Sequence, residues 1–540
     1  MRSRIRFPRE VRTRELHEGQ LSNQPGPCLT ESTEDSLVAR KPVLWGILLC
    51  VLFLLGLAAR LPYLDAPPLK SHGTRQLHSA TIARAFYYRG AVKGLSEPQR
   101  RAALAAGEKE NTLEPPVMER LAAFGYRLLG REALWLPRLL AAFFWVVGGW
   151  FVYRIARSIA SASAGLFSTF FYLFLPFSVY LSRNFQPDPL MIMLMLAGMD
   201  RVVAYHQKPT PARLILAAAV CAAALLVKPV CVFLVFGSFL ALSVSNRGLR
   251  RGLLDPALAG FAVIALLPTA LYYGYGLFAV GSLRNQAQMS FIPRLLLDPR
   301  FWSGWLRHIL GAVGLAALLG GLLGIQLHRK GSPRALLLGL WGSYLFFGVV
   351  FNYHIKSHDY YQLQLVPVVA LSIGPLCAWI LRNAWHANPQ RFWRTATVGV
   401  LAVGILAAGL EIHSSLWVNR PEIDRQVALA EEVGELVHHS TKTIYLSRTH
   451  GKPLLYYGHV SGQAWPRLMD FYLPSFQPMK SLTAEERMKR LDPDGSAEYF
   501  IVTRFSSLDA QPGLKALLEK RPVVAEGKGF RIFDLRPAQP

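Results

Sequence analysis

Charged side chains interrupt the apolar sequence at a few places, and these are the places where chemistry is expected. The segment Asn352–Gln362 crowds cations, a carboxylate and tyrosines together, and Arg183 and Asp188 lie on either side of an Asn-Phe-Gln-Pro turn. Lys228 stands alone inside an apolar block. A charged residue in such surroundings is costly and usually faces a polar cavity or reaches the interface. These positions therefore predict a binding site for an anionic group.

Another polar group lies in the segment 62–133, between the first two apolar stretches. Its members are Asp65, His72, Arg75, Gln76, His78 and Arg84. A solvated loop with helices on the membrane surface would explain any single one of them. The cluster as a whole favours a functional site.

Asp188 allows two interpretations. It precedes a predicted helix, where a carboxylate satisfies free backbone N–H groups and suits the helix dipole. A carboxylate in a polar cavity is also able to accept a proton as a general base. The residue is therefore a candidate for either a helix cap or a catalytic group.

Apolar stretches long enough to cross a bilayer must position these residues. About 18 to 20 apolar residues cross the hydrocarbon core. Such stretches occur at 43–61, 134–154, 163–182, 188–205, 254–275, 306–327, 335–352, 363–382 and 395–413. Residues 212–245 are too long for one span and are interrupted at Lys228-Pro229, which predicts a hairpin of two short helices. The expected fold class is an α-helical polytopic membrane protein with about eleven transmembrane helices.

Basic residues fall in alternate loops, and this pattern predicts the orientation. The predicted inside loops contain the cations Arg154, Arg201, Lys208, Arg213 and Arg247. Residues 1–41 are polar and basic and are expected to form a disordered cytoplasmic tail. Residues 42–413 form the predicted transmembrane domain, whose loop 62–133 carries amphipathic helices, one over 82–89 and a second from Glu114-Pro115-Pro116 to Leu129. That loop and residues 414–540 then lie outside the plasma (inner) membrane.

Residues 414–540 have a different character from the rest. An amphipathic helix is expected around 422–438, and strand-like runs occur at Thr443–Ser447, Tyr499–Thr503 and Phe530–Leu535. This alternation predicts a small extracytoplasmic α/β domain. No glycine-rich phosphate fingerprint follows a strand there, which argues against a nucleotide site.

Composition excludes two other classes. Of the 540 residues, 52% are hydrophobic and 17% are charged, which is too apolar for an ordinary soluble enzyme. The formal net charge of +25 resides mostly in short loops, so it indicates topology and not nucleic-acid binding. The five cysteines lie in the tail or in apolar spans, so neither a disulfide framework nor redox chemistry is expected.

Short motifs follow one another in order along the membrane part. They are Ile82-Ala83-Arg84, Glu114-Pro115-Pro116, Pro187-Asp188-Pro189, Leu226-Val227-Lys228-Pro229, and Lys356 followed by Tyr360-Tyr361. Their order and sidedness resemble the GT-C superfamily of membrane glycosyltransferases over residues 43–410. Within it, the chain is similar to the protein-mannosyltransferase and lipid A aminoarabinose-transferase group (glycosyltransferase family 39-like).

The resemblance implies an inverting enzyme that transfers a sugar from a polyprenyl-phosphate donor. The acceptor would be a lipid, glycan or protein on the outer face of the membrane. Membrane lipids are the other expected partners, and no nucleic acid is expected. The resemblance names neither the sugar nor the acceptor.

The resemblance also implies roles for individual residues. Asp188 is the first choice for the base, and His72 and His78 are alternatives because an unperturbed imidazole titrates near neutral pH. The expected donor-phosphate site comprises Arg75, Gln76, Arg183, Lys228, Lys356, His358, Tyr360 and Tyr361. A divalent metal remains an option, although no ligand spacing specifies one.

One departure from the family leaves alternative functions open. The acidic pair of the family's first loop falls on Arg75-Gln76, so the residue usually credited as base or metal ligand is replaced. A non-catalytic GT-C-like binding protein is therefore one alternative. A lipid or glycan transporter or flippase is another, but it should place charges near the membrane midplane, whereas these charges gather at one face.

Overall fold

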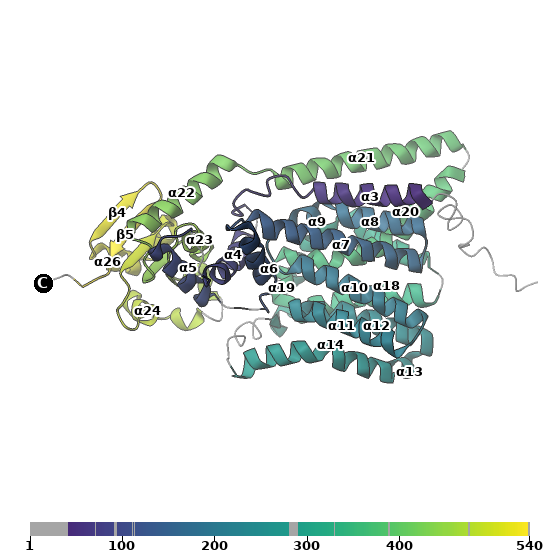
Figure 1. The fold of residues 1–540 in the computed structure, drawn as a ribbon, viewed down its shortest axis with the longest axis horizontal. Helices are drawn as coiled ribbons and strands as arrows, with labels where there is room; N and C mark the ends of the chain where they lie inside the picture. The colour runs from purple at the N-terminus through teal and green to yellow at the C-terminus, as the bar shows by residue number, and fades with distance from the viewer. Residues whose placement is uncertain are drawn as a thin grey trace, which may run out of the picture.

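The structure is a computed structural model that describes residues 42–70, 72–90, 94–110, 112, 114–279, 290–328, 330–386, 389–472 and 476–537. The predicted tail, residues 1–41, lies outside the described residues. Figure 1 shows a bundle of long helices at one end of the molecule and a smaller α/β part at the other, with shorter helices between them.

The long helices of the bundle run side by side, as expected of a polytopic membrane protein, and several short helices and one sharply bent pair accompany them (Figure 1). They are α3 (Pro42–Ala58), α7 (Trp135–Ile159), α8 (Ala162–Phe174), α9 (Pro176–Leu181), α10 (Asp188–Gln207), α11 (Pro211–Val227), α12 (Val232–Arg247), α13 (Leu249–Leu253), α14 (Pro256–Gly274), α16 (Pro299–Val313), α17 (Leu315–Gln326), α18 (Ser332–Val350), α19 (Asn352–Ser357), α20 (Leu365–His386) and α21 (Gln390–Leu416). Within the described ranges, six helical segments are long and apolar enough to cross a membrane, or up to seven if the bent pair α16–α17 is one span. Three shorter apolar helices, α3, α8 and α11, accompany them.

The predicted hairpin at Lys228-Pro229 is confirmed. Helix α11 ends at Val227, Lys228 is extended with φ −160° and ψ 115°, and a 3₁₀ turn over Pro229–Cys231 leads into α12. Proline ends the helix here because it has no N–H to donate and disfavours helical geometry in the residue before it. The break leaves Lys228 at the tip of the hairpin.

Two predicted single spans are each broken into two helices. Residues 163–182 form α8 and α9, separated at Leu175 before Pro176. Residues 306–327 form parts of α16 and α17, which meet at an angle of 88°. The hinge of the second pair is Gly314, whose φ of 75° is a left-handed conformation that glycine adopts readily.

Three helices fold the segment 62–133 between the bundle and the α/β part (Figure 1). They are α4 (Gly73–Tyr88), α5 (Glu97–Lys109) and α6 (Val117–Leu129). Helix α4 begins earlier than the predicted stretch 82–89, and α5 was not predicted individually. A capping box between Ser96 and Gln99 starts α5.

The α/β part contains one five-stranded sheet in the order β2-β1-β3-β5-β4. The strands are β1 (Thr443–Leu446), β2 (Gly462–Ala464), β3 (Tyr499–Val502), β4 (Val523–Gly527) and β5 (Phe530–Asp534). Strand β1 pairs in parallel with β2 and β3, whereas β5 pairs antiparallel with β3 and β4. The predicted strands correspond to β1, β3 and β5, and the two edge strands were missed.

Helices cover both faces of this sheet. On one face, α22 (Arg420–Leu436) and α23 (Lys452–Tyr456) pack on Tyr445, Ile501 and Ile532. On the other, α24 (Ala484–Leu491), α25 (Phe505–Asp509) and α26 (Pro512–Glu519) pack on Leu446 and Phe500. Helix α23 also packs against α4 and α5, so the sheet part rests directly on the segment 62–133.

Candidate functional site

The centre of the candidate site is a buried ion pair between Lys228 and Asp188. The hairpin tip places Lys228 beside the first residue of the neighbouring helix α10, and the ammonium donates to both carboxylate oxygens of Asp188, at 2.9 and 3.0 Å. Each side chain is only 4% exposed. Asp188 makes no described capping bond to the start of α10, so its carboxylate is committed to Lys228.

Glu114 extends this pair into a network of alternating charge. One of its oxygens lies 4.0 Å from the Lys228 ammonium, and the other accepts a hydrogen bond of 2.8 Å from Arg75. Burial acts to raise the pKa of Glu114, but the charges of Arg75 and Lys228 outweigh it and lower that pKa. Burial conversely acts to lower the pKa of Arg75, and Glu114 raises it. Two cations and two anions therefore balance in one cluster, in which Lys228 and Asp188 are buried and Arg75 and Glu114 are partly buried.

Sequence reasoning did not assign Glu114 to the site. The residue was noted only as part of the Glu114-Pro115-Pro116 motif. The two prolines after Glu114 indicated an extended segment before α6, but this pattern does not predict a partner for the carboxylate.

Aromatic rings lie above the Lys228 ammonium. Their centroids are 5.1 Å away for Tyr360 and 5.0 Å away for Tyr361, within the range of cation–π attraction. His354 stacks on Tyr361, and His358 contacts the edge of Tyr360. Burial, with the nearby charge of Lys228, lowers the pKa of both histidines to about 4. They are therefore neutral near pH 7.

Both histidines predicted as alternative bases are paired with carboxylates. His72 Nε2 lies 2.7 Å from Asp359 Oδ1, and His78 Nδ1 lies 2.6 Å from Glu110 Oε2. Glu110 also pairs with Lys452 of the α/β part. Burial acts to raise the pKa of Glu110, but the bonds from His78 and Lys452 lower it. This arrangement ties α4 to the domain that covers it.

The remaining predicted site residues lie around this cluster with other partners. Gln76 is buried and its oxygen accepts a 3.1 Å hydrogen bond from the backbone of Phe185. Lys356 lies 3.8 Å from Asp298 at the start of α16, and Arg183 donates to the carbonyl of Pro62. Within the described contacts, neither Lys356 nor Arg183 touches Lys228 or Asp188. The structure thus brings together Arg75, Asp188, Lys228 and the two tyrosines, but not all the predicted cations.

A metal site is not visible in the described part of the chain. Those residues contain no group of three or more His, Cys, Asp or Glu side chains that could hold a metal ion.

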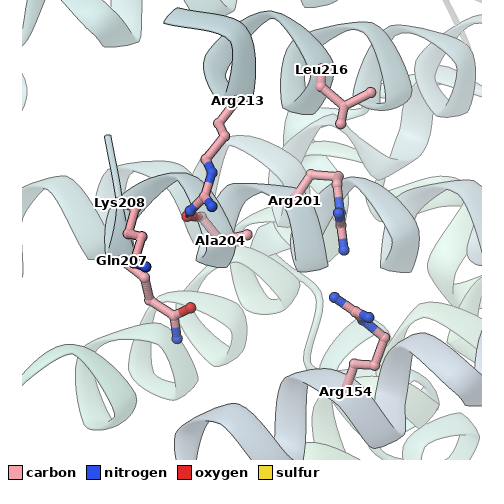
Figure 2. A pocket seen from close by; sticks show the side chains of 7 residues that line it. All are labelled: Arg154, Arg201, Ala204, Gln207, Lys208, Arg213 and Leu216. Atoms are coloured by element: carbon pink, nitrogen blue, oxygen red, sulfur yellow. The ribbon is translucent and has the colours of Figure 1, made fainter. Parts of the chain in front are cut away.

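A basic hollow lies at the other end of the bundle from Lys228 and Asp188, where α7 and α10 end and α11 begins. Figure 2 shows its cations, which include Arg154, Arg201, Lys208 and Arg213. Asp200 pairs with both Arg154 and Arg201. These are the cations that the sequence predicted for the inside loops, and their distance along α10 and α11 from Asp188 and Lys228 separates them from the candidate site.

Comparisons with known proteins agree with this architecture. Residues 113–273 match the family model of dolichyl-phosphate-mannose-protein mannosyltransferase. No curated protein sequence matches the chain significantly.

Solved structures share the fold over most of the chain. ArnT from Cupriavidus metallidurans in the apo state is 15% identical with a TM-score of 0.54, covering 93% of this chain and 98% of ArnT. The same ArnT bound to undecaprenyl phosphate gives a TM-score of 0.54 at 15% identity, covering 92% of this chain and 98% of ArnT. Archaeal oligosaccharyltransferase AglB from Archaeoglobus fulgidus, in complex with an inhibitory peptide and a dolichol-phosphate, is 12% identical with a TM-score of 0.56, covering 89% of this chain and 73% of AglB.

The family model covers the segment that contains Glu114, Asp188 and Lys228, and the shared fold extends over the α/β part as well. The resemblance noted in the sequence is thereby confirmed: the chain is a multi-pass membrane protein with the fold of the GT-C glycosyltransferase superfamily.

Proposed function

We propose that this protein is a glycosyltransferase that moves a sugar from a polyprenyl-phosphate donor to an acceptor on the extracytoplasmic face of the membrane. The observation that carries the proposal is the buried Lys228–Asp188 ion pair, joined by Glu114 and Arg75 at the end of the bundle beside the α/β part. Solved proteins of the same fold bind undecaprenyl phosphate or a dolichol-phosphate.

Lys228 is the proposed binding group for the donor phosphate. Among the described residues, Asp188 is the carboxylate nearest to this ammonium, and a phosphate bound beside Tyr360 and Tyr361 would compete with that carboxylate for it. Lys binds phosphate as a compact point charge, and charge-assisted hydrogen bonds are the strong ones. Donor binding would therefore release Asp188 from its partner.

The released Asp188 is the proposed general base. It accepts the proton of the acceptor hydroxyl or amine while the acceptor atom bonds to the anomeric carbon and the bond from that carbon to the phosphate oxygen breaks. The leaving polyprenyl phosphate retains the bonding electrons, and Lys228 and Arg75 stabilise its charge. A single displacement of this kind inverts the anomeric centre.

Turnover of purified protein tests the proposal. Incubation with a panel of polyprenyl-phosphate sugars and an acceptor extract should release polyprenyl phosphate. Asp188→Asn should lower the rate by about 10²- to 10⁴-fold, because an amide does not accept the proton. Asp424→Asn, on the exposed face of α22, is the matched control and should leave the rate unchanged. Equal turnover in Asp188→Asn would remove Asp188 from the chemistry.

A non-catalytic binding protein is the second candidate, and one observation favours it. Arg75 occupies the position of the family's acidic pair, and in the structure it neutralises Glu114 instead of offering a carboxylate. Such a protein would bind polyprenyl phosphate through Lys228 without releasing it from any sugar donor. Saturable donor binding with no turnover across the sugar panel would support this alternative.

A further inference from the structure

Three buried arginines form a second cationic cluster, apart from Lys228. Arg60 follows α3, Arg138 lies in the first turn of α7, and Arg183 lies between α9 and α10. Their exposed fractions are 0%, 7% and 3%, and the charges of Arg60 and Arg138 act directly on Arg183. The chain has brought three guanidinium groups together from distant parts of its sequence.

Backbone carbonyls satisfy only part of this cluster. Arg138 donates to the carbonyls of Leu64 and Ala66 at 2.6 and 2.7 Å, and Arg183 donates to that of Pro62. Four buried N–H groups still have no hydrogen-bond partner among the described residues: Nε of Arg138, Nε of Arg183, Nη2 of Arg60 and Nδ2 of Asn184. Holding the loop after α3 in place therefore does not account for all the N–H donors of the cluster.

The charge of the cluster is also uncompensated. No carboxylate of the described residues forms an ion pair with Arg60, Arg138 or Arg183. Asp65 acts on the cluster from a distance, but it is 64% exposed and is paired with Arg420 at 3.0 Å. Buried cations are ordinarily paired, and a buried polar group without a partner indicates a missing ligand, ion or water.

A hollow opens beside these groups. Arg138, Arg183 and Asn184 line it together with Gln76, Tyr180 and Lys70, and the cavity itself has a volume of about 30 Å³. The Lys70 ammonium is held at the rim by the carbonyls of Ser415 and Ser414, at 2.9 and 3.3 Å. The unpartnered donors of Arg138, Arg183 and Asn184 thus belong to side chains that line one cavity.

One wall of the hollow lies at the outer edge of the helix bundle, at the end of α21 (Figure 1). Ser415, Leu416 and Val418, at the end of α21, form one side of it. Figure 1 shows α21 and α3 along the same outer side of the bundle, and exposed apolar side chains such as Leu54, Val400 and Leu410 cover them. A molecule held by the arginines would have its apolar part beside these two helices.

We propose that this hollow binds the phosphate group of an anionic membrane lipid, at a site separate from the Lys228 cluster. Guanidinium groups suit phosphate because their planar N–H donors match two phosphate oxygens at once. The 183–188 turn connects the two sites. Gln76 lines the hollow and accepts a hydrogen bond from Phe185 of this turn, and Asp188 at its end pairs with Lys228. The two sites are therefore neighbours, but their cations are different. The proposal does not depend on glycosyl transfer.

Lipid retention by the full-length protein tests the proposal without any turnover. The protein is purified in nanodiscs of phosphatidylcholine with or without phosphatidylglycerol, and the lipids that stay bound are identified by native mass spectrometry. Phosphatidylglycerol should be retained selectively by the parent protein and at least tenfold less by Arg183→Gln. Arg213→Gln, in the basic hollow of Figure 2, is the matched control and should retain it like the parent.

A second arm separates a lipid from free phosphate. Inorganic phosphate is titrated into protein in detergent, against chloride at equal ionic strength, and thermal unfolding is followed. Phosphate stabilisation without a preference for phosphatidylglycerol would overturn the lipid assignment. No preference in either arm, or equal retention by Arg183→Gln, would overturn the site.

A milder variant covers the case in which Arg183→Gln does not fold. Asn184→Ala removes one unpartnered donor of the hollow and no charge, so the protein should fold and retain less phosphatidylglycerol than the parent. Unchanged retention in that variant would contradict the proposal.

Discussion

Replacing Asp188 by asparagine should destabilise the folded protein, although asparagine is as good a helix cap as aspartate. The structure shows no capping bond from Asp188, and both carboxylate oxygens accept from the Lys228 ammonium instead. The substitution therefore leaves a cation that is 4% exposed without its counter-charge. Removing one partner of a buried ion pair costs roughly 3–5 kcal/mol.

Two features place the expected loss toward the lower end of that range. The Glu114 carboxylate remains 4.0 Å from the ammonium, and the asparagine oxygen still accepts one hydrogen bond. We therefore expect Asp188→Asn to lower the free energy of unfolding by about 3 kcal/mol. Lys228→Met should cost a similar amount, since it leaves Asp188 uncompensated.

The double variant separates charge from packing. Asp188→Asn combined with Lys228→Met removes both charges, so it should be more stable than the sum of the single losses by about 2 kcal/mol. The assay is reversible unfolding in mixed micelles titrated with sodium dodecyl sulfate, with Asp424→Asn as the control. Single and double variants that are all as stable as the parent would refute the buried pair and the proposed exchange of Lys228 between Asp188 and phosphate.

Other expected outcomes concern Glu114, the histidines and the topology. Glu114→Gln leaves the Arg75 cation unpaired and should lower the free energy of unfolding by about 2 kcal/mol in the same assay, whereas an unchanged value would contradict the ion pair. Burial lowers the pKa of His354 and His358 from 6.5 to about 4. Between pH 6.5 and pH 4 the folded state therefore binds fewer protons than the unfolded state. Stability should accordingly be full above pH 6.5 and fall as the pH falls toward 4, and the fall should be smaller in His358→Gln. A cysteine in place of the exposed Ser506 should react with an impermeant thiol reagent in intact cells, and labelling only after lysis would reverse the proposed orientation.

Properties of the local chain were sufficient for the fold class and for several elements. The length of the apolar runs indicated a polytopic membrane protein, and the missing N–H of Pro229 indicated the break after Lys228. Strands β1 and β3 were predictable because all their residues are buried, which requires a continuous apolar run. Strands β2 and β4 lie at the sheet edges and contain no buried residue, so their sequences carry no such pattern.

The contacts within the site depended on how the helices pack, which local sequence does not encode. Sidedness placed Arg75, Arg183, Asp188 and Lys228 at one end of the bundle, but it did not say which cation meets which carboxylate. Only the packing of α10 against α11 joins Asp188 to Lys228, and only the fold of segment 62–133 brings Glu114 between Lys228 and Arg75. Arg183, five residues from Asp188, lies instead with Arg138 because the turn before α10 directs the two side chains to different partners.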